Sequence, residues 1–199
     1  NRNSLNEFLE RLITNCKRNK KEFAYLFLDL DNFKSINDSL GHNIGDELLQ
    51  GVSKKLHNIL RPSDFVARIG GDEFTVIIQD YHNYSGLISI IQRIHKCIST
   101  PWLIQKNTIN ISCSVGIAIF PKDGDNTITL MKNSDIAMYE AKKLGRNQYH
   151  FFTKELNTKV QSIISLSENL KTALENNEYE LYYQPKVDIK TSKIVSVEA

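Results

Sequence analysis

The stretch from Phe23 to Leu30 is almost entirely apolar, and it constrains the fold more than any other feature of this sequence. Such a run is typical of a β-strand that is buried on both faces, so its sheet must be covered on both sides. Two acids, Asp29 and Asp31, stand at the end of the run. We therefore expect a central strand whose end carries carboxylates.

A second acidic pair, Asp72 and Glu73, follows the paired glycines between two short apolar strands, residues 65–69 and 74–78. Paired glycines suit a tight hairpin turn. Adjacent carboxylates repel each other, and a divalent cation would offset that cost. If the two acidic strand ends converge, they predict a Mg²⁺ site with room for substrate phosphates. The alternative is that each acidic pair is a solvated turn.

A calcium-binding loop that starts at Asp29 is excluded by its spacing. The fifth, sixth and twelfth positions of such a loop should be an oxygen ligand, glycine and glutamate. They are Phe33, Lys34 and Leu40 in this chain.

The remaining pattern predicts an α/β (α+β) protein with a mixed, mostly antiparallel central sheet covered by helices, a ferredoxin-like core. In some segments apolar residues recur at helical spacing. In other segments apolar and polar residues alternate, or an apolar run begins after a helix breaker, and both patterns are typical of strands. The predicted helices are residues 4–18, 32–38, 46–60, 84–98, 128–144 and 156–176, and the further strands are a short one after Pro101, then residues 110–120, 149–152 and 179–185.

Composition and charge exclude several classes of protein. The net charge of the 199 residues is +2, and Lys and Arg are dispersed, so we expect no nucleic-acid binding. The three cysteines, Cys16, Cys97 and Cys113, lack metal-ligand spacing and favour a reducing, cytoplasmic setting. No apolar run is long enough to span a membrane, so we expect no membrane contact by this segment. Both ends look cut from a longer protein, which leaves an anchor elsewhere open.

Two further pairs suggest nucleotide binding. Asn37 and Asp46 can together match a guanine edge, which offers one acceptor and two donors; alternatively they are ordinary helix caps. Lys142 and Arg146 lie four apart across a helix end and could hold phosphates, or could simply complement the helix dipole. A helix that starts at Asn32 also presents free N–H groups that suit phosphate.

Four segments together, in the order found here, resemble the signature of GGDEF domains, and the match extends over about residues 5–152. Members of this family make cyclic di-GMP from two GTP molecules, and their fold resembles the palm of nucleotidyl cyclases and polymerases. The segments are residues 29–46, 68–74, 114–118 and 135–147, the second of which contains the naming motif Gly70-Gly71-Asp72-Glu73-Phe74.

The resemblance implies a catalytic metal centre. Asp29, Asp72 and the Leu30 carbonyl would bind Mg²⁺ or Mn²⁺. Asp72 or Glu73 would help to remove the proton from the attacking ribose 3′-hydroxyl. Because each domain would bind one GTP, the resemblance also implies that two domains must face each other in a homodimer.

The resemblance also implies substrate and product contacts. Asn37 and Asp46 would read guanine, with His42 beside the substrate. Arg61 and Asp64 match the family's RxxD site, where cyclic di-GMP binds and inhibits; the alternative is a helix-stop turn with a surface ion pair. The phosphates would be held by the backbone of Asn32 and Phe33 together with Lys34, Lys142 and Arg146.

The tail resembles the start of an EAL domain, the cyclic di-GMP phosphodiesterase family, at residues 181–188 and 197–199. We expect three parts: residues 1–155 as the GGDEF domain, 156–176 as a linker helix and 177–199 as the truncated EAL start. Glu198 would be a metal ligand in a whole EAL domain, but this segment alone would have no phosphodiesterase activity. The expected function is diguanylate cyclase; the alternatives are a silent GTP-binding or dimerising regulatory module and an ATP-using cyclase.

Overall fold

The computed structural model describes residues 2–176 and 178–199, in two compact units, Asn1–Thr158 and Lys159–Ala199. The first unit is built on a mixed sheet with the strand order β2-β3-β1-β6-β7. The pairs β1–β3, β1–β6 and β2–β3 are antiparallel, and only β6–β7 is parallel among the described strand pairs of this sheet. The strands are β1 (Phe23–Leu30), β2 (Phe65–Gly70), β3 (Glu73–Gln79), β6 (Cys113–Phe120) and β7 (Tyr149–Phe151).

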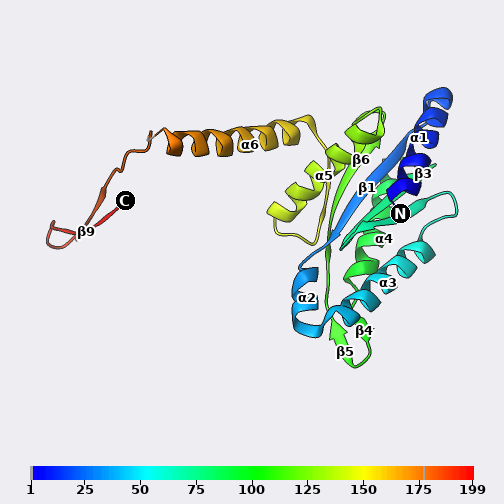
Figure 1. The fold of residues 1–199 in the computed structure, drawn as a ribbon, viewed down its shortest axis with the longest axis horizontal. Coiled ribbons are helices and arrows are strands. Elements are labelled where there is room, and N and C mark those ends of the chain that lie inside the picture. The colour runs from blue at the N-terminus through cyan, green and yellow to red at the C-terminus, as the bar shows by residue number, and fades with distance from the viewer. Residues whose placement is uncertain (1, 177) are drawn as a thin grey trace. The chain divides into compact units, whose positions relative to one another are not determined.

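Helices cover both faces of this sheet (Figure 1). The mixed sheet and its helical layers confirm the predicted fold class. The helices are α1 (Arg2–Asn19), α2 (Phe33–Leu40), α3 (His42–Ile59), α4 (Tyr84–Ser99), α5 (Thr127–Lys143) and α6 (Lys154–Glu175), and a small hairpin is formed by β4 (Trp102–Ile104) and β5 (Asn107–Ile109).

Strand alternation sends the two faces of β1 into two different cores. Even-numbered residues such as Leu26 pack with α3 and α4, whereas odd-numbered residues such as Tyr25 pack with α1 and α5. Helix α5 lies close to β6 at Gly116, where any Cβ atom would collide with the backbone of Ser134 and Met138. The glycine therefore sets the distance at which α5 covers the odd-numbered face, the face on which Asp29 lies.

Some predicted boundaries are wrong. Helix α3 begins at His42, not at Asp46, because Gly41 adopts φ +88° and lets the chain leave α2 and re-enter a helix at once. Strand β6 begins at Cys113 rather than at residue 110, and the sequence pattern missed β5. In the tail, residues 179–183 are not in a strand; the strand β8 begins at Gln184.

The second unit contains the antiparallel pair β8 (Gln184–Val187) and β9 (Ile194–Glu198). An ion pair of 2.8 Å joins Lys186 Nζ to Glu198 Oε2 across the pair. The connecting turn is held by Asp188, whose carboxylate accepts hydrogen bonds from the backbone N–H groups of Lys190 and Thr191. Within the described residues of the whole chain, none of the helices combines the length and apolarity that crossing a membrane would require.

Candidate active site

The end of β1 and the tip of the β2–β3 hairpin meet at one edge of the sheet. Asp29 pairs in register with Glu73, so the two carboxylates lie opposite each other on adjacent strands. The Leu30 N–H donates a hydrogen bond to the backbone carbonyl of Asp72, with a nitrogen–oxygen distance of 3.2 Å. Gly71 takes φ +49° at the turn, which a glycine adopts without steric cost. The structure therefore brings the two acidic segments together.

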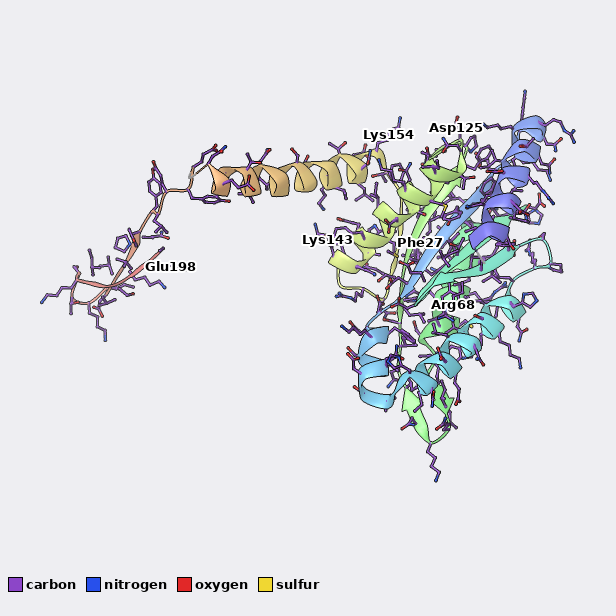
Figure 2. The ribbon with its side chains drawn as sticks, viewed as in Figure 1. Phe27, Arg68, Asp125, Lys143, Lys154 and Glu198 are labelled. Atoms are coloured by element: carbon purple, nitrogen blue, oxygen red, sulfur yellow. The ribbon has the colours of Figure 1, made fainter. Side chains whose placement is uncertain are left out.

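Lys142, near the C-terminal end of α5, forms an ion pair with Asp29. Its Nζ is 2.8 Å from Asp29 Oδ2, and the side chains are only 29% and 12% exposed, respectively. The neighbouring Lys143 is exposed (Figure 2). A partly shielded ion pair of this kind is stronger than one on the open surface.

Burial and negative neighbours both disfavour ionisation of the acids at this edge. The pKa of Asp29 is raised, first by burial and then by the charges of Asp72 and Asp31, although Lys142 opposes the shift. The pKa of Glu73 is raised by burial and then by Asp29 and Asp72. Excess negative charge is therefore built into this edge, and a cation would relieve it.

The second acid of β1, Asp31, has a structural role that the sequence analysis missed. It is 5% exposed, and its oxygens accept hydrogen bonds from Ser114 Oγ at 2.7 Å, Ser112 Oγ at 2.6 Å and the Asn147 N–H at 3.0 Å. The last bond fixes the loop after α5 to the end of β1. The pattern held a signal for this role, because Ser112 and Ser114 alternate onto the same face of their strand.

These acids fit a magnesium ion by the chemistry of their donors. Mg²⁺ is usually bound by one or two carboxylates together with waters and substrate phosphates, and Asp29 and Asp72 are two such carboxylates. The ammonium of Lys142 already demonstrates that a cation is stabilised at Asp29. Within the described residues, no cluster of three or more His, Cys, Asp or Glu side chains is arranged to hold a metal, so substrate phosphates would have to complete the coordination.

The predicted guanine-binding residues lie on α2 and α3. The Oδ1 atom of Asn37 is buried, and no described residue gives it a hydrogen-bond partner. It occupies the space that a Cβ atom of Gly45 would need, which makes Gly45 a positioning residue for the amide. Asp46 is exposed one residue later, and His42 is exposed on the first turn of α3.

The predicted phosphate-binding residues surround the same edge. Asn32, at the N-cap of α2, adopts φ 58°, a left-handed conformation that asparagine tolerates. Phe33 is buried and fixes the helix, whereas Lys34 is exposed. Arg146 is also exposed, with φ 64°, one residue before the loop anchor at Asn147. Lys142 pairs with Asp29 and stays partly exposed.

The predicted product-inhibition residues lie at the opposite end of β3. The Asp64 carboxylate accepts hydrogen bonds from the backbone N–H groups of Arg61 at 3.0 Å and Gln79 at 3.1 Å. Gln79 ends β3 and Glu73 begins it, so about 20 Å of strand separates Asp64 from the acidic edge. Any ligand at Arg61 would therefore act from a separate site.

A further acid that the sequence analysis did not assign, Asp135 on α5, lies beside the edge. It lines a hollow of about 250 Å³ with Glu73, Tyr25 and Phe27. Its negative charge adds to the shift that raises the pKa of Glu73. The pKa of Asp135 itself is raised by burial.

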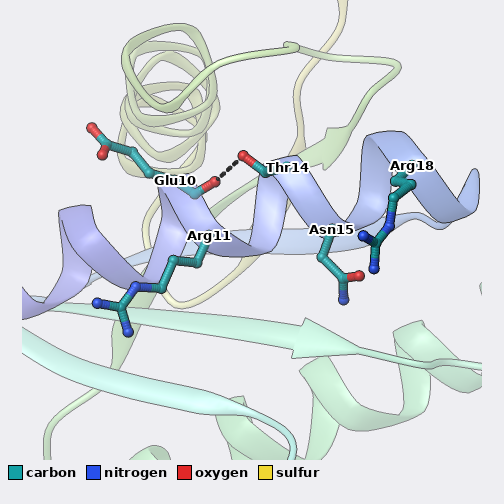
Figure 3. A pocket seen from close by; sticks show the side chains of 5 residues that line it. All are labelled: Glu10, Arg11, Thr14, Asn15 and Arg18. Atoms are coloured by element: carbon teal, nitrogen blue, oxygen red, sulfur yellow. Dashed lines mark hydrogen bonds between the residues drawn. The ribbon is translucent and has the colours of Figure 1, made fainter.

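Another hollow, of about 430 Å³, is lined by residues on one surface of α1 (Figure 3). The Thr14 hydroxyl in this hollow already has a partner, because its Oγ1 donates to the backbone carbonyl of Glu10 at 2.9 Å. It contains no metal-ligand cluster and carries no chemistry comparable to that of the acidic edge. The lining residues are Glu10, Arg11, Thr14, Asn15 and Arg18.

Comparisons with known proteins support a family assignment. Residues 1–148 match the model of "Diguanylate cyclase, GGDEF domain". The whole chain is 40% identical to MucR of Pseudomonas aeruginosa, a bifunctional diguanylate cyclase/cyclic di-GMP phosphodiesterase, and 37% identical to NbdA, a cyclic di-GMP phosphodiesterase of the same organism. It spans only 29% and 25% of these relatives.

A solved structure agrees with these matches. The GGDEF domain of TpbB (YfiN) from Pseudomonas aeruginosa superposes with a TM-score of 0.77 at 32% identity, over 80% of this chain and 94% of that one. The family match covers both acidic segments and the α5 segment that carries Lys142. From its sequence and its fold alike, this chain belongs to the GGDEF domain family.

Proposed function

We propose that residues 1–155 act as a diguanylate cyclase domain, which condenses two GTP molecules into cyclic di-GMP and releases pyrophosphate. The observation that carries the proposal is the meeting of Asp29 with the hairpin acids at one edge, where Asp29 and Glu73 are register partners. The family model supports the same activity. An edge with excess carboxylate suits a cation-bound triphosphate better than a neutral ligand.

Each part of the edge has a role in this proposal. Asp29 and Asp72 would hold Mg²⁺ or Mn²⁺, which supplies charge neutralisation for the triphosphate when bound. Glu73 or Asp72 would accept the proton of the ribose 3′-hydroxyl, whose oxygen then attacks the α-phosphate of the second GTP. The raised pKa of Glu73, caused first by burial, makes its carboxylate a stronger base than an ordinary glutamate.

Substrate recognition would come from α2, α3 and the end of α5. The unpartnered Asn37 Oδ1 would accept from the guanine, and Asp46 would accept its remaining N–H groups. His42, on the first turn of α3, would lie beside the substrate. The phosphates would be held by the backbone of Asn32 and Phe33 and by Lys34, Lys142 and Arg146.

The reaction needs two bound substrates, so we propose a homodimer in which two acidic edges face each other. Holding both GTP molecules in line would supply much of the rate by positioning. Cyclic di-GMP bound at Arg61 and Asp64 would inhibit from the separate site at the other end of β3.

We also propose that residues 177–199 begin an EAL domain and that 156–176 link the two. The alignment with MucR continues through all 199 residues, beyond the end of the GGDEF match at residue 148. In this chain Glu198, the residue that would be a metal ligand of an EAL domain, pairs with Lys186. Expression of the chain with its natural continuation and a cyclic di-GMP hydrolysis assay would test the assignment.

The decisive experiment is to incubate the chain with GTP and Mg²⁺ and to measure cyclic di-GMP by mass spectrometry. We expect product from the wild type and none from Asp72→Ala, which should keep its thermal stability because the substitution relieves carboxylate repulsion. Asp125→Ala, which changes an exposed acid elsewhere, should keep full activity. Nucleotide binding without product would favour the alternative function, a silent GTP-binding or dimerising module for the EAL domain.

The choice of nucleotide can be tested at Asn37 and Asp46. If the chain reads guanine, Asn37→Ala and Asp46→Ala should abolish GTP turnover. An ATP-using cyclase would instead turn over ATP, and these variants would leave that activity intact.

A further inference from the structure

The contact between Lys142 and Asp29 raises a question about the order of binding. The Lys142 ammonium is 2.8 Å from Asp29 Oδ2, and the Asp29 side chain is only 12% exposed. A magnesium ion binds a carboxylate oxygen at about 2.0–2.1 Å. If both cations contacted this oxygen, they would lie within about 5 Å of each other in a partly shielded site, where their repulsion is strong.

Hydrogen bonds hold the backbone next to Lys142, whereas its side chain is long and has several rotatable bonds. The loop after α5 is fixed to β1, because the Asn147 N–H donates to the buried carboxylate of Asp31. The Gly145 and Arg146 N–H groups also bond back to the end of α5, at the carbonyls of Lys142 and Ala141. Lys142 itself has a flexible four-carbon stem. Its ammonium can therefore leave Asp29 by side-chain rotation, without movement of the helix.

Resting on the function proposed above, we propose that Lys142 is an internal counter-ion that occupies the cation position on Asp29 until a triphosphate draws it away. The lysine then has two successive partners: Asp29 in the nucleotide-free domain and the substrate phosphates in the loaded one. Metal binds weakly to the free domain and firmly once nucleotide has moved the ammonium. This coupling keeps the carboxylates neutralised in both states.

Metal binding in the absence of nucleotide tests this exchange directly. Mg²⁺ would be titrated by calorimetry into the wild type, Lys142→Met and the control Lys143→Met, which changes the exposed neighbouring lysine. We expect Lys142→Met to bind Mg²⁺ at least about tenfold more tightly than the wild type. Lys143→Met should match the wild type. Lys142→Arg, which keeps the positive charge, should also bind weakly, and adding Asp29→Asn to Lys142→Met should abolish the gain.

Thermal unfolding gives a second readout and shows whether each variant folds. Because a ligand that binds only the folded state raises its stability, Mg²⁺ should raise the melting temperature of Lys142→Met more than that of the wild type. If Lys142→Met does not fold in the absence of metal, Lys142→Gln takes its place in both measurements.

A Lys142→Met chain that binds Mg²⁺ no better than the wild type, whether both bind it or neither does, would overturn the proposal. So would an equal gain in Lys143→Met, which would indicate a general charge effect. The experiment contains no GTP, so its result does not depend on cyclase activity. Failure of the proposed function would appear separately, as absent product in the GTP assay.

Discussion

Asp29 and Glu73 lie directly opposite each other across β1 and β3, two carboxylates in register at the edge of a buried sheet. Like charges at such positions destabilise a sheet, typically by a few tenths of a kcal/mol up to about 1 kcal/mol. Burial is the first cause of the raised pKa of both groups; the charge of Asp29 further raises the pKa of Glu73, whereas Asp72 and Asp31 further raise that of Asp29. A sheet that served stability alone would not keep this pair.

Glu73→Gln should therefore stabilise the domain while it weakens the proposed proton transfer. In metal-free buffer near neutral pH we expect a melting temperature about 1–3 °C higher than that of the wild type, because one member of the repelling pair is gone. Differential scanning fluorimetry would measure this. Glu7→Gln, on the exposed face of α1, is the matched control and should change little. A lower melting temperature for Glu73→Gln would mean that the carboxylate has a stabilising partner.

The sequence was sufficient for the fold class, a mixed, mostly antiparallel sheet covered by helices. The apolar run of β1 and the glycine turn at Gly71 each impose a local conformation that tertiary packing reinforces, so the predicted layers are confirmed. The start of α3 was placed four residues too late, at Asp46 instead of His42. Gly45 lies inside the helix, and the Asn37 amide occupies the space that a Cβ atom at this position would need.

The pattern of residues in the sequence could not predict contacts between segments that are far apart along the chain. The position of Lys142 in the sequence does not indicate that its ammonium forms an ion pair with Asp29. The two side chains meet only because α5 packs closely on the sheet, at a distance set by Gly116. Asp31 was read only as the second acid of a pair, because its three donors come from β6 and from the loop after α5. The individual site roles remain predictions.

Gly45→Ala tests the placement of the Asn37 amide. The added methyl would take the space of Asn37 Oδ1 and displace the acceptor proposed for guanine. We expect GTP affinity to fall roughly five- to tenfold, the loss of about one hydrogen bond, as measured by calorimetry with a non-hydrolysable analogue. The control is Gly86→Ala on α4, whose methyl would make an ordinary 3.4 Å contact with Asn83 Oδ1. Unchanged affinity in Gly45→Ala would remove Asn37 from the proposed site.

Asp31→Asn should destabilise the domain markedly. The carboxylate is buried and accepts from two serines and the Asn147 N–H, and an amide nitrogen cannot accept. A loss on the order of 3 kcal/mol follows for hydrogen bonds to a charged acceptor, or roughly 6–12 °C in melting temperature. Ser112→Ala, which removes one donor, should cost much less. If Asp31→Asn and Ser112→Ala cost the same, Asp31 is not the anchor of the loop.

Because the pKa of the Tyr81 phenol is raised, we expect the folding stability of the domain to fall at alkaline pH. Burial and then the negative charge of Glu22 raise the pKa of its phenol to about 12 from the ordinary value of 10.0. Between these two pH values the unfolded chain has released the proton while the folded chain keeps it, so stability falls as pH rises. Tyr81→Phe should lose less stability than the wild type over this window in urea unfolding. Tyr139→Phe, at an exposed tyrosine, is the control; an identical slope in Tyr81→Phe and the wild type would contradict the assignment.

The proposed product-inhibition site is best tested at Arg61, because its partner Asp64 also holds the local backbone in place. Both oxygens of Asp64 accept backbone hydrogen bonds, from Arg61 and Gln79, so Asp64→Ala would disturb the turn before β2 and confuse inhibition with folding. Arg61→Ala removes only a side chain and leaves those bonds in place. In the cyclase assay we expect the same initial rate as the wild type and continued synthesis at cyclic di-GMP concentrations that stop the wild type.

The matched control is Arg93→Ala, which removes an arginine from α4 whose guanidinium donates to the Ile59 carbonyl at the end of α3. It should leave the inhibition curve unchanged. Because about 20 Å of β3 separates Asp64 from the acidic edge, inhibition at Arg61 cannot act by direct displacement of GTP in the same domain. Inhibition that persists in Arg61→Ala, with the same concentration for half-maximal effect, would remove Arg61 from the proposed product-inhibition site.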